Sequence, residues 1–295
     1  MPLIEYTLDG RVDKVQKAIE RIRLFDPSQS EYLQYLAPYY VCYSGGKDSD
    51  VLRILFELSG VKHELWHNHT TVDAPETVYY VRSIPGINIS HPEITMWELI
   101  IQKRIPPLRQ MRYCCALLKE RGGQRRFIAT GVRWAESIGR RAKRGSLEIQ
   151  KRKANAGLIL NADNANDRDI FEMCPTQGKR VLNPIVDWSD ADVWEFLRHY
   201  GCKSNPLYEC GFKRVGCLGC PMTGEKERRR EFAMYPKYQD IYIHTFDRMI
   251  AHAADVGKLC TTWTTGQKVF DWWIKDPERQ EPIDENQITL WEETT

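Results

Sequence analysis

The chain has 295 residues, of which 42% are hydrophobic and 28% charged, and its formal net charge is +2. This composition excludes an intrinsically disordered chain, and the length suffices for one large domain or a domain with an appendage. The apolar runs are short and interrupted by charges, so we expect no membrane span. Because the N-terminus also lacks the pattern of a signal peptide, we expect a cytoplasmic protein.

Predicted helices and strands alternate along the first half of the chain. Apolar residues at helical spacing predict a helix over residues 11–24. Strands are expected at 38–43, 63–67, 87–90 and 126–130, and helices at 48–58, 75–82, from Met96 onward and at 113–120. This alternation predicts an α/β fold with a doubly wound parallel sheet that is covered by helices on both faces.

The second half of the chain lacks the alternation of strands and helices that the first half shows. Residues 140–179 are polar and weakly periodic, which predicts a long insertion or mobile loop. A helix is expected at 189–200 with Ser189 as its N-cap, followed by a long helical pattern over 225–254 and a shorter one near 267–275. We therefore expect a main domain over residues 1–223, with an insertion at about 140–180, and a helical C-terminal region over 224–295.

A glycine-rich loop lies between the first predicted strand of the sheet and the helix that follows. It reads Ser44-Gly45-Gly46-Lys47-Asp48-Ser49. The glycines let the backbone approach a ligand closely, and a helix N-terminus presents amide groups to an anion. Lys47 adds a positive charge, and the two serines add hydroxyl groups. The loop therefore predicts phosphate binding without the spacing of a Walker A motif; the alternative is a plain tight connection.

The roles of Asp48 and of the basic residues near position 140 have two interpretations each. Asp48 either helps to hold Mg²⁺ through a water molecule or caps the helix. The basic segment either contacts a phosphate backbone or forms a solvated loop. Its members are Arg140, Arg141, Lys143, Arg144, Lys151, Arg152 and Lys153.

The nine cysteines are clustered in a way that suggests a metal centre, because disulfides are rare in a reducing compartment. Cys114 and Cys115 are adjacent, and Cys217 and Cys220 form a C-x-x-C pair. Neighbouring thiolates can bind different irons of a cubane, so these four cysteines are the predicted ligands of a 4Fe–4S cluster. The alternative is a zinc knuckle, which would leave the adjacent pair unexplained. Its ligands would be Cys202, Cys210, Cys217 and Cys220.

These motifs resemble those of two related groups of enzymes. The glycine-rich loop resembles the PP-loop of ATP pyrophosphatases, which implies that ATP binds there and that Lys47 and the loop amides hold pyrophosphate. The cysteine pairs are similar to the cluster motif of adenylylsulfate reductases. Other motifs resemble the wider PAPS reductase family, namely Asp73–Thr77, Thr130–Arg133, Glu136, Ser137, Arg140, Asn183–Ile185, Asp187–Trp188 and Asn205–Tyr208. The resemblance implies nucleotide contacts by Asp73, Gly131 and Arg133, and charge neutralisation by Arg133 and Arg140.

Two departures separate this sequence from the sulfonucleotide reductases. Their loop lacks the lysine, and they carry a catalytic Glu-Cys-Gly motif near the C-terminus, whereas here Glu209-Cys210-Gly211 lies within the cysteine region and Cys260 has no such motif. The combination resembles the sulfur-transfer subunits of DNA phosphorothioation systems and, more distantly, tRNA thiolases.

The second resemblance implies a reaction and its partners. ATP and Mg²⁺ would adenylylate an oxygen of a nucleic-acid acceptor, DNA rather than tRNA, and release pyrophosphate. Sulfur from a cysteine desulfurase would then displace AMP. The alternatives are a sulfonucleotide reductase and a nucleotide-sensing module without catalysis.

Overall fold

The chain forms two units, and each is assembled from segments that are separated in the sequence. The computed structural model describes residues 3–7, 10–31, 38–150, 158–161, 179–255, 257 and 263–280. The first unit comprises Met1–Asn68, Pro75–Ser90 and Gly122–Val215, and the second comprises His69–Ala74, His91–Arg121 and Gly216–Thr295. The domain boundary expected after residue 223 stays a prediction.

A sheet forms the centre of the first unit. Its order in the described residues is β5 (Asn88–Ser90), β4 (His63–Asn68), β3 (Tyr39–Cys42), β6 (Phe127–Ala129), β9 (Lys179–Leu182), β7 (Leu147–Gln150) and β8 (Leu158–Leu160). Neighbouring strands from β5 to β9 pair in parallel, and β7 and β8 are antiparallel additions. The expected α/β fold with a mainly parallel sheet is confirmed.

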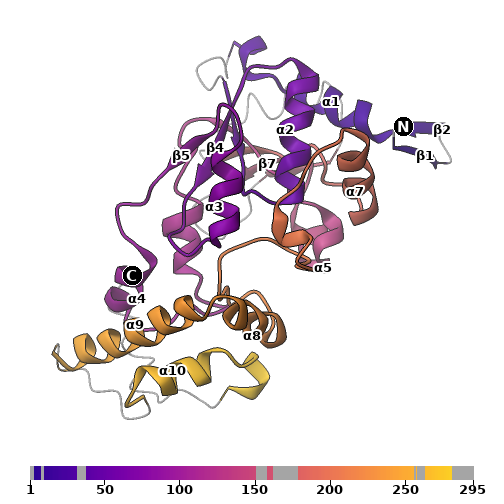
Figure 1. The fold of residues 1–295 in the computed structure, drawn as a ribbon. Coiled ribbons are helices and arrows are strands. Elements are labelled where there is room, and N and C mark those ends of the chain that lie inside the picture. Colours follow the sequence, from indigo (N-terminus) through magenta and orange to yellow (C-terminus); the bar gives the residue numbers. More distant parts are fainter. Residues whose placement is uncertain are drawn as a thin grey trace. The chain divides into compact units, whose positions relative to one another are not determined.

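The helices of the first unit begin where the sequence supplies a cap or a proline. They are α1 (Lys14–Leu24), α2 (Lys47–Ser59), α3 (Pro75–Arg82), α5 (Ile138–Lys143) and α7 (Asp190–His199). The first helix starts later than predicted because the Asp13 side chain accepts hydrogen bonds from the amides of Val15 and Gln16. The preceding residues instead form a hairpin of β1 (Ile4–Thr7) and β2 (Gly10–Asp13) beside α1 (Figure 1).

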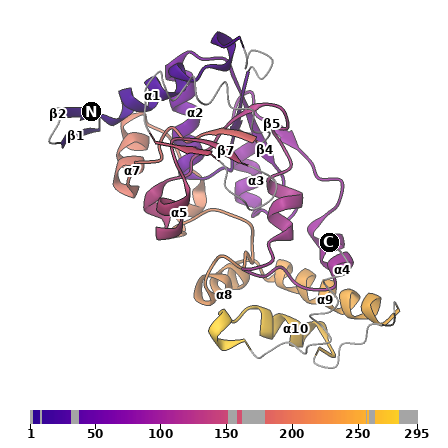
Figure 2. The same cartoon turned by 180° about the vertical axis from the view of Figure 1, so that it is seen from behind.

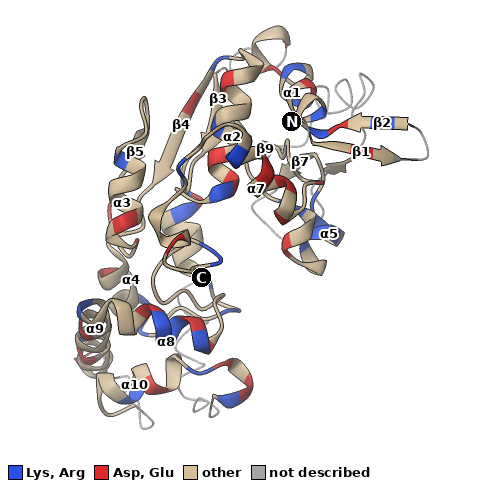
Figure 3. Cartoon of the chain, turned by 45° about the vertical axis from the view of Figure 1, so that its right-hand side comes forward, with Lys and Arg blue, Asp and Glu red and all other residues tan. Residues whose placement is uncertain are grey.

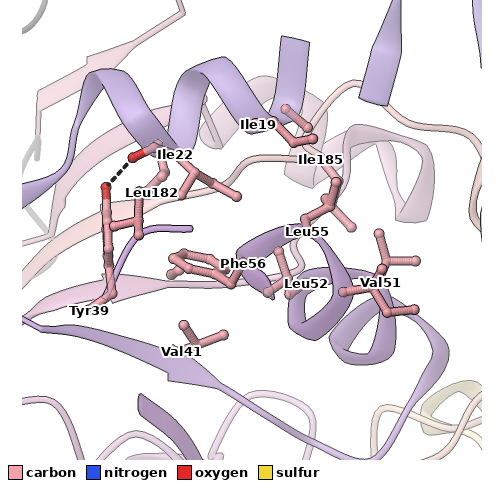
Figure 4. Close-up of a cluster of buried hydrophobic side chains, with 14 of the residues drawn as sticks. Ile19, Ile22, Tyr39, Val41, Val51, Leu52, Leu55, Phe56, Leu182 and Ile185 are labelled. Atoms are coloured by element: carbon pink, nitrogen blue, oxygen red, sulfur yellow. Dashed lines mark hydrogen bonds between the residues drawn. The ribbon is translucent and has the colours of Figure 1, made fainter. Parts of the chain in front are cut away.

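One face of the sheet carries the main hydrophobic core of this unit. Figure 4 shows side chains of α1 and α2 meeting those of β3, among them Ile22, Phe56 and Val41. The buried Tyr39 hydroxyl donates to the carbonyl of Ile22, which ties α1 to the strand. Since side chains alternate along a strand, Tyr40 faces the other way and belongs to a smaller buried cluster.

The segment expected as a loop over residues 140–179 contains regular structure. β7 pairs with β9 and β8, and Leu147 and Ile149 are buried in the core. The loop interpretation was wrong for these residues because short apolar stretches in a polar segment gain their strand structure from a neighbouring edge, which local periodicity does not reveal. Residues 151–157 and 162–178 of this segment lie outside the described residues.

The second unit is helical in its described part. Its helices are α4 (Met96–Lys103), a π-helix (Cys115–Lys119), α8 (Glu225–Met234), α9 (Pro236–Asp255) and α10 (Gly266–Trp273). Pro236 divides the pattern predicted as one helix, because proline starts a helix readily but interrupts one. Tyr242, Phe246 and Trp273 pack together in a core that joins α9 and α10, which lie side by side (Figures 1 and 2). None of the described helices is long and apolar enough to cross a membrane.

Candidate functional site

The glycine-rich loop connects β3 to α2 through a backbone geometry that needs glycine at one position. Gly45 has a φ of +75°, and a Cβ there would lie 2.9 Å from Cγ2 of Val81. Gly46 is the N-cap of α2. The Ser49 hydroxyl accepts from the amide of Gly46 and donates to its carbonyl, at 3.1 and 2.7 Å. The loop thus turns tightly into the N-terminus of α2, where backbone amides attract anions.

Two basic side chains meet at the start of α2. Lys47 and Arg133 are both buried. Nζ of Lys47 lies 3.4 Å from Oδ1 of Asp190 and 3.9 Å from Oδ2 of Asp48. Nε of Arg133 donates to Asp48 at 2.7 Å, and its Nη2 donates to Asp190 at 2.6 Å. Two carboxylates therefore hold both predicted phosphate-binding cations in place.

The electrostatics of the two carboxylates differ. Burial raises the pKa of Asp48, although Arg133 and Lys47 act in the opposite direction. Burial also opposes ionisation of Asp190, but the hydrogen bond from Arg133 and the charge of Lys47 outweigh it and lower the pKa of Asp190. Asp190 is accordingly the better stabilised anion of the pair.

Gly131 lies against the same helix start, and Arg140 is close enough to interact electrostatically with Asp48. A Cβ at Gly131 would lie 3.1 Å from the carbonyl oxygen of Asp48, so the chain passes very close to α2 there. Arg140 forms an ion pair with Glu136. Burial lowers the pKa of Arg140, and the positive charges of Arg214 and Arg144 lower it further.

The cysteines predicted as metal ligands line one cavity in the second unit. Cys114, Cys115, Cys217 and Cys220 surround it together with Lys119. A hydrogen bond from Cys114 lowers the pKa of Cys115, and the positive charges of Lys119 and Arg112 contribute to this shift. Burial raises the pKa of Cys217 to about 11, although the positive charge of Lys119 acts against it. The structure therefore brings together cysteine pairs that are a hundred residues apart in the sequence.

Four thiol side chains line the cavity, and thiolates are the donors that a 4Fe–4S cluster uses. Among the described residues, no group of three or more His, Cys, Asp or Glu side chains is arranged to hold one metal ion. A cubane binds each thiolate at a different iron, so its ligands surround the group and need not converge on one point. The knuckle alternative fits less well, because Cys210 is exposed and Cys202 contacts Arg53 at 3.8 Å in the first unit.

Asp73 lies in the second unit with the cysteines. Its carboxylate accepts a hydrogen bond from the amide of Thr70 at 2.8 Å, and its backbone forms a bridge with Cys217. The predicted nucleotide contact of Asp73 stays a prediction.

Two residues of these sites, Asp190 and Lys119, were not singled out from the sequence as site residues, and Tyr208 was noted only as part of the Asn205–Tyr208 motif. Asp190 was interpreted only as part of a helix start. Tyr208, whose hydroxyl accepts from the amide of Lys47 at 2.9 Å, is separated from the loop by 161 residues. Lys119 follows Cys115 by one turn of the π-helix, and nearby Cys217 raises its pKa despite burial. The sequence contained two signals for these residues, namely the spacing of Lys119 after the paired cysteines and the Asn205–Tyr208 motif.

Known proteins resemble this chain mostly over part of their length. An uncharacterized 37.8 kDa protein of Escherichia phage 186 is 27% identical over 154 residues, which cover 52% of this chain and 42% of that protein. The adenosine 5'-phosphosulfate reductase of Allochromatium vinosum is 42% identical over 43 residues, covering 15% of this chain and 17% of the reductase. The chain spans less than half the length of the curated relatives it matches.

Two solved structures match this chain at low sequence identity. The phosphoadenylyl-sulfate reductase of Candida auris in a phosphate complex is 16% identical, with a TM-score of 0.40, and covers 72% of this chain and 97% of the reductase. The U34-tRNA thiolase NcsA of Methanococcus maripaludis, with its [4Fe-4S] cluster, is 10% identical, with a TM-score of 0.41 and coverages of 83% and 80%.

A family model matches more than half of the sequence in one continuous range. The model described as the phosphoadenosine phosphosulfate reductase domain matches residues 38–223. This range includes the glycine-rich loop, Arg133, Asp190 and both cysteine pairs. The chain therefore belongs to the phosphoadenosine phosphosulfate reductase domain family.

Proposed function

We propose that this protein is an ATP pyrophosphatase that cleaves ATP to AMP and pyrophosphate and thereby activates an acceptor for sulfur transfer. The observation that carries the proposal is the burial of Lys47 at the N-terminus of α2, where its ammonium group lies 3.4 Å from an exposed carboxylate. A lysine, an arginine and a helix N-terminus at one point form a strong binding site for phosphate groups.

The chemistry follows from where charge grows during the reaction. An acceptor oxygen attacks the α-phosphorus, the bond to the bridging oxygen of the β-phosphate breaks, and pyrophosphate leaves with the bonding electrons. Lys47 and the loop amides would stabilise the leaving group. Arg133 and Arg140 would neutralise the α-phosphate, and Asp48 would help to hold Mg²⁺ through a water molecule.

The second step would transfer sulfur to the acceptor. A cysteine desulfurase and a thiol reductant would supply sulfide-level sulfur, which would attack the activated atom as AMP leaves with the original oxygen. A 4Fe–4S cluster would be held by Cys114, Cys115, Cys217 and Cys220. Its iron would bind the sulfur atom that is to be transferred. The basic residues near Arg140 favour a nucleic acid as acceptor, and we propose DNA in preference to tRNA.

The identity of the cleaved bond tests the first step. Labelled ATP, incubated with Mg²⁺ and duplex DNA or tRNA, should give AMP and pyrophosphate. Lys47→Ala should lower turnover by roughly 10²–10³-fold, the scale associated with loss of one preorganised charge-stabilising group. Lys62→Ala, an exposed lysine elsewhere in the same unit, should leave turnover unchanged. ADP as the sole product would contradict the proposal, and tight ATP binding without cleavage would favour a nucleotide-sensing module.

Sulfonucleotide reduction is the second candidate, and family membership favours it. Cys210 is exposed within Glu209-Cys210-Gly211, the tripeptide that resembles the reductase motif. Our proposal predicts no sulfite from adenylylsulfate or its 3'-phosphorylated form when thioredoxin is supplied. Thioredoxin-dependent sulfite release that is lost in Cys210→Ser would establish reduction instead.

A further inference from the structure

One carboxylate in the first unit is bound to both buried cations while remaining largely open to solvent. The Asp190 side chain is 72% exposed, and those of Lys47 and Arg133 are 9% and 2% exposed. Both cations approach the same oxygen, since Oδ1 of Asp190 lies 2.6 Å from Nη2 of Arg133 and 3.4 Å from Nζ of Lys47. A carboxylate oxygen shared by an arginine and a lysine has the same bonding partners that a phosphate oxygen would take.

The carboxylate of Asp190 is not needed to begin α7. Ser189 caps this helix by accepting from the amide of Asp192 at 3.2 Å, and the Asp192 side chain accepts from the amide of Ser189 at 2.7 Å. Asp190 is the first helical residue, where a negative charge is favourable but replaceable. Its side chain can therefore leave the cations without opening the helix.

The other carboxylate on Arg133 is less exposed to solvent. Asp48 is only 26% exposed and keeps Nε of Arg133 at 2.7 Å. If Asp190 moved into solvent, Arg133 would retain one carboxylate and present Nη2 to a new anion. Among the described residues, the one carboxylate that would then remain in an ion pair with Lys47 is Asp48, at 3.9 Å. A phosphate oxygen would therefore be a closer anionic partner for the ammonium group.

We propose that Asp190 is an internal substitute for phosphate, which occupies Lys47 and Arg133 until a phosphate group of the nucleotide displaces it. This inference rests on the proposed function, because it assumes that the loop binds the phosphates of ATP. Displacement makes binding a competition between two anions, so the apparent affinity for phosphate is lower than that of the emptied site. Asp190 thus lowers the affinity for the nucleotide and neutralises the charges of Lys47 and Arg133 between reaction cycles.

Asp190→Asn tests the proposal with magnesium-free pyrophosphate as the probe. The variant should bind pyrophosphate roughly threefold to tenfold more tightly than the wild type, the range expected when one or two partly exposed ion pairs no longer compete. Association measured by stopped flow should also be faster, because no side chain has to leave first. Asp190→Glu, which retains the charge, should bind with nearly the affinity of the wild type.

Asp192→Asn is the matched control for charge. It removes the same charge from the same helical turn, but Asp192 pairs with Lys14 rather than with the loop cations. A similar gain in pyrophosphate affinity in both Asn variants would show that the loss of one negative charge explains the effect. This result would overturn the proposal. Unchanged or weaker binding by Asp190→Asn would overturn it as well, provided that the melting curve of the variant shows a folded protein. If Asp190→Asn does not fold, Asp190→Ser is the second variant for the same measurement. No binding by either the wild type or Asp190→Asn would instead contradict the proposed function.

Discussion

The two neighbouring glycines of the glycine-rich loop, Gly45 and Gly46, have different physical roles. The sequence alone does not distinguish them. Gly45 adopts a left-handed conformation and faces Val81 and Thr77, whereas Gly46 has a φ of −102° and faces the Tyr208 hydroxyl. Asn205 adds a hydrogen bond of 3.1 Å to the carbonyl of Gly45. Only the first glycine is required by its backbone conformation.

A pair of alanine substitutions should separate these roles. Gly45→Ala should reduce the free energy of unfolding by about 1–3 kcal/mol, because a Cβ in this conformation is strained and also meets Val81. Gly46→Ala should cost much less and should mainly weaken pyrophosphate binding by crowding the approach to the amides. Chemical denaturation and calorimetric titration of both variants measure the two effects. Equal losses of stability would show that the backbone does not distinguish the glycines.

A buried acid lies just beyond the loop. Asp50 accepts hydrogen bonds from the hydroxyls of Tyr43 and Tyr80 at 2.5 and 3.0 Å, and its Oδ2 has no partner among the described residues. Burial raises the pKa of Asp50 to about 6 against these hydrogen bonds. The folded-state pKa of Asp50 lies above the unfolded value, so folding favours the protonated carboxyl group. The contribution of Asp50 to the free energy of unfolding is therefore fully present below about pH 4 and is lost as the pH rises through 6.

Asp50→Asn should therefore change how stability depends on pH. Relative to the wild type, the variant should gain stability between pH 4 and 7, by at most roughly 3 kcal/mol for a shift of this size. Urea denaturation across this range measures the difference. Tyr80→Phe removes one hydrogen-bond donor to the Asp50 carboxylate, which raises the pKa of Asp50 further. In this variant the loss of stability should therefore occur at a higher pH than in the wild type. Parallel stability profiles for Asp50→Asn and the wild type would show that Asp50 does not titrate in this range.

At the scale of secondary structure, α5 carries the basic character of the segment that was expected to contact a phosphate backbone. Figure 3 shows Lys and Arg on this helix. Arg140 and Arg144 are paired with Glu136 and Glu148, while Arg141 and Lys143 are exposed. The two exposed residues are therefore the better candidates for contacts with nucleic acid.

Replacing Arg141 and Lys143 together by alanine should weaken binding to duplex DNA at every sequence tested. The slope of log K against log salt concentration should become shallower by about 2, since each lost phosphate contact removes roughly 0.9. Fluorescence anisotropy at several salt concentrations gives the slope. Lys237 and Lys268, two exposed lysines of the second unit, form a control pair with the same loss of charge. If both double variants behaved alike, α5 would have no specific role.

At the scale of the whole molecule, the loop and the cysteines belong to different units with separate hydrophobic cores. The core of the first unit includes Leu55 and Phe56, and that of the second includes Tyr242 and Phe246. A ligand that binds only the folded form of a site stabilises that form by mass action. Pyrophosphate and the metal should therefore protect different parts of the chain.

Hydrogen exchange should reveal this division. Pyrophosphate should slow exchange in α1 and α2, and iron loading should slow it in α9 and the π-helix. Lys47→Ala should remove only the first effect and Cys217→Ser only the second. Protection of both units by either ligand alone would show that their stabilities are coupled.

Metal analysis distinguishes the cluster from the knuckle in the same molecule. Anaerobically purified protein should contain about four irons per chain, and Cys115→Ser should lower the iron content. Cys210→Ser should leave it unchanged, because this exposed cysteine is absent from the cavity that the other four line. One zinc per chain that is lost in Cys210→Ser and retained in Cys115→Ser would establish the knuckle.

The sequence by itself determined the alternation of strands and helices and the nature of the glycine-rich loop. These depend on local patterns: apolar spacing, an N-cap, or two glycines before a helix. The spacing of the cysteine pairs and a family resemblance predicted that they share one site, and the tertiary structure places both pairs around one cavity. Strands β7 and β8 and the contacts of Asp190 and Tyr208 were decided by tertiary structure alone. A sheet edge and a shared oxygen between two cations join residues far apart in the chain, and no local pattern encodes such neighbours.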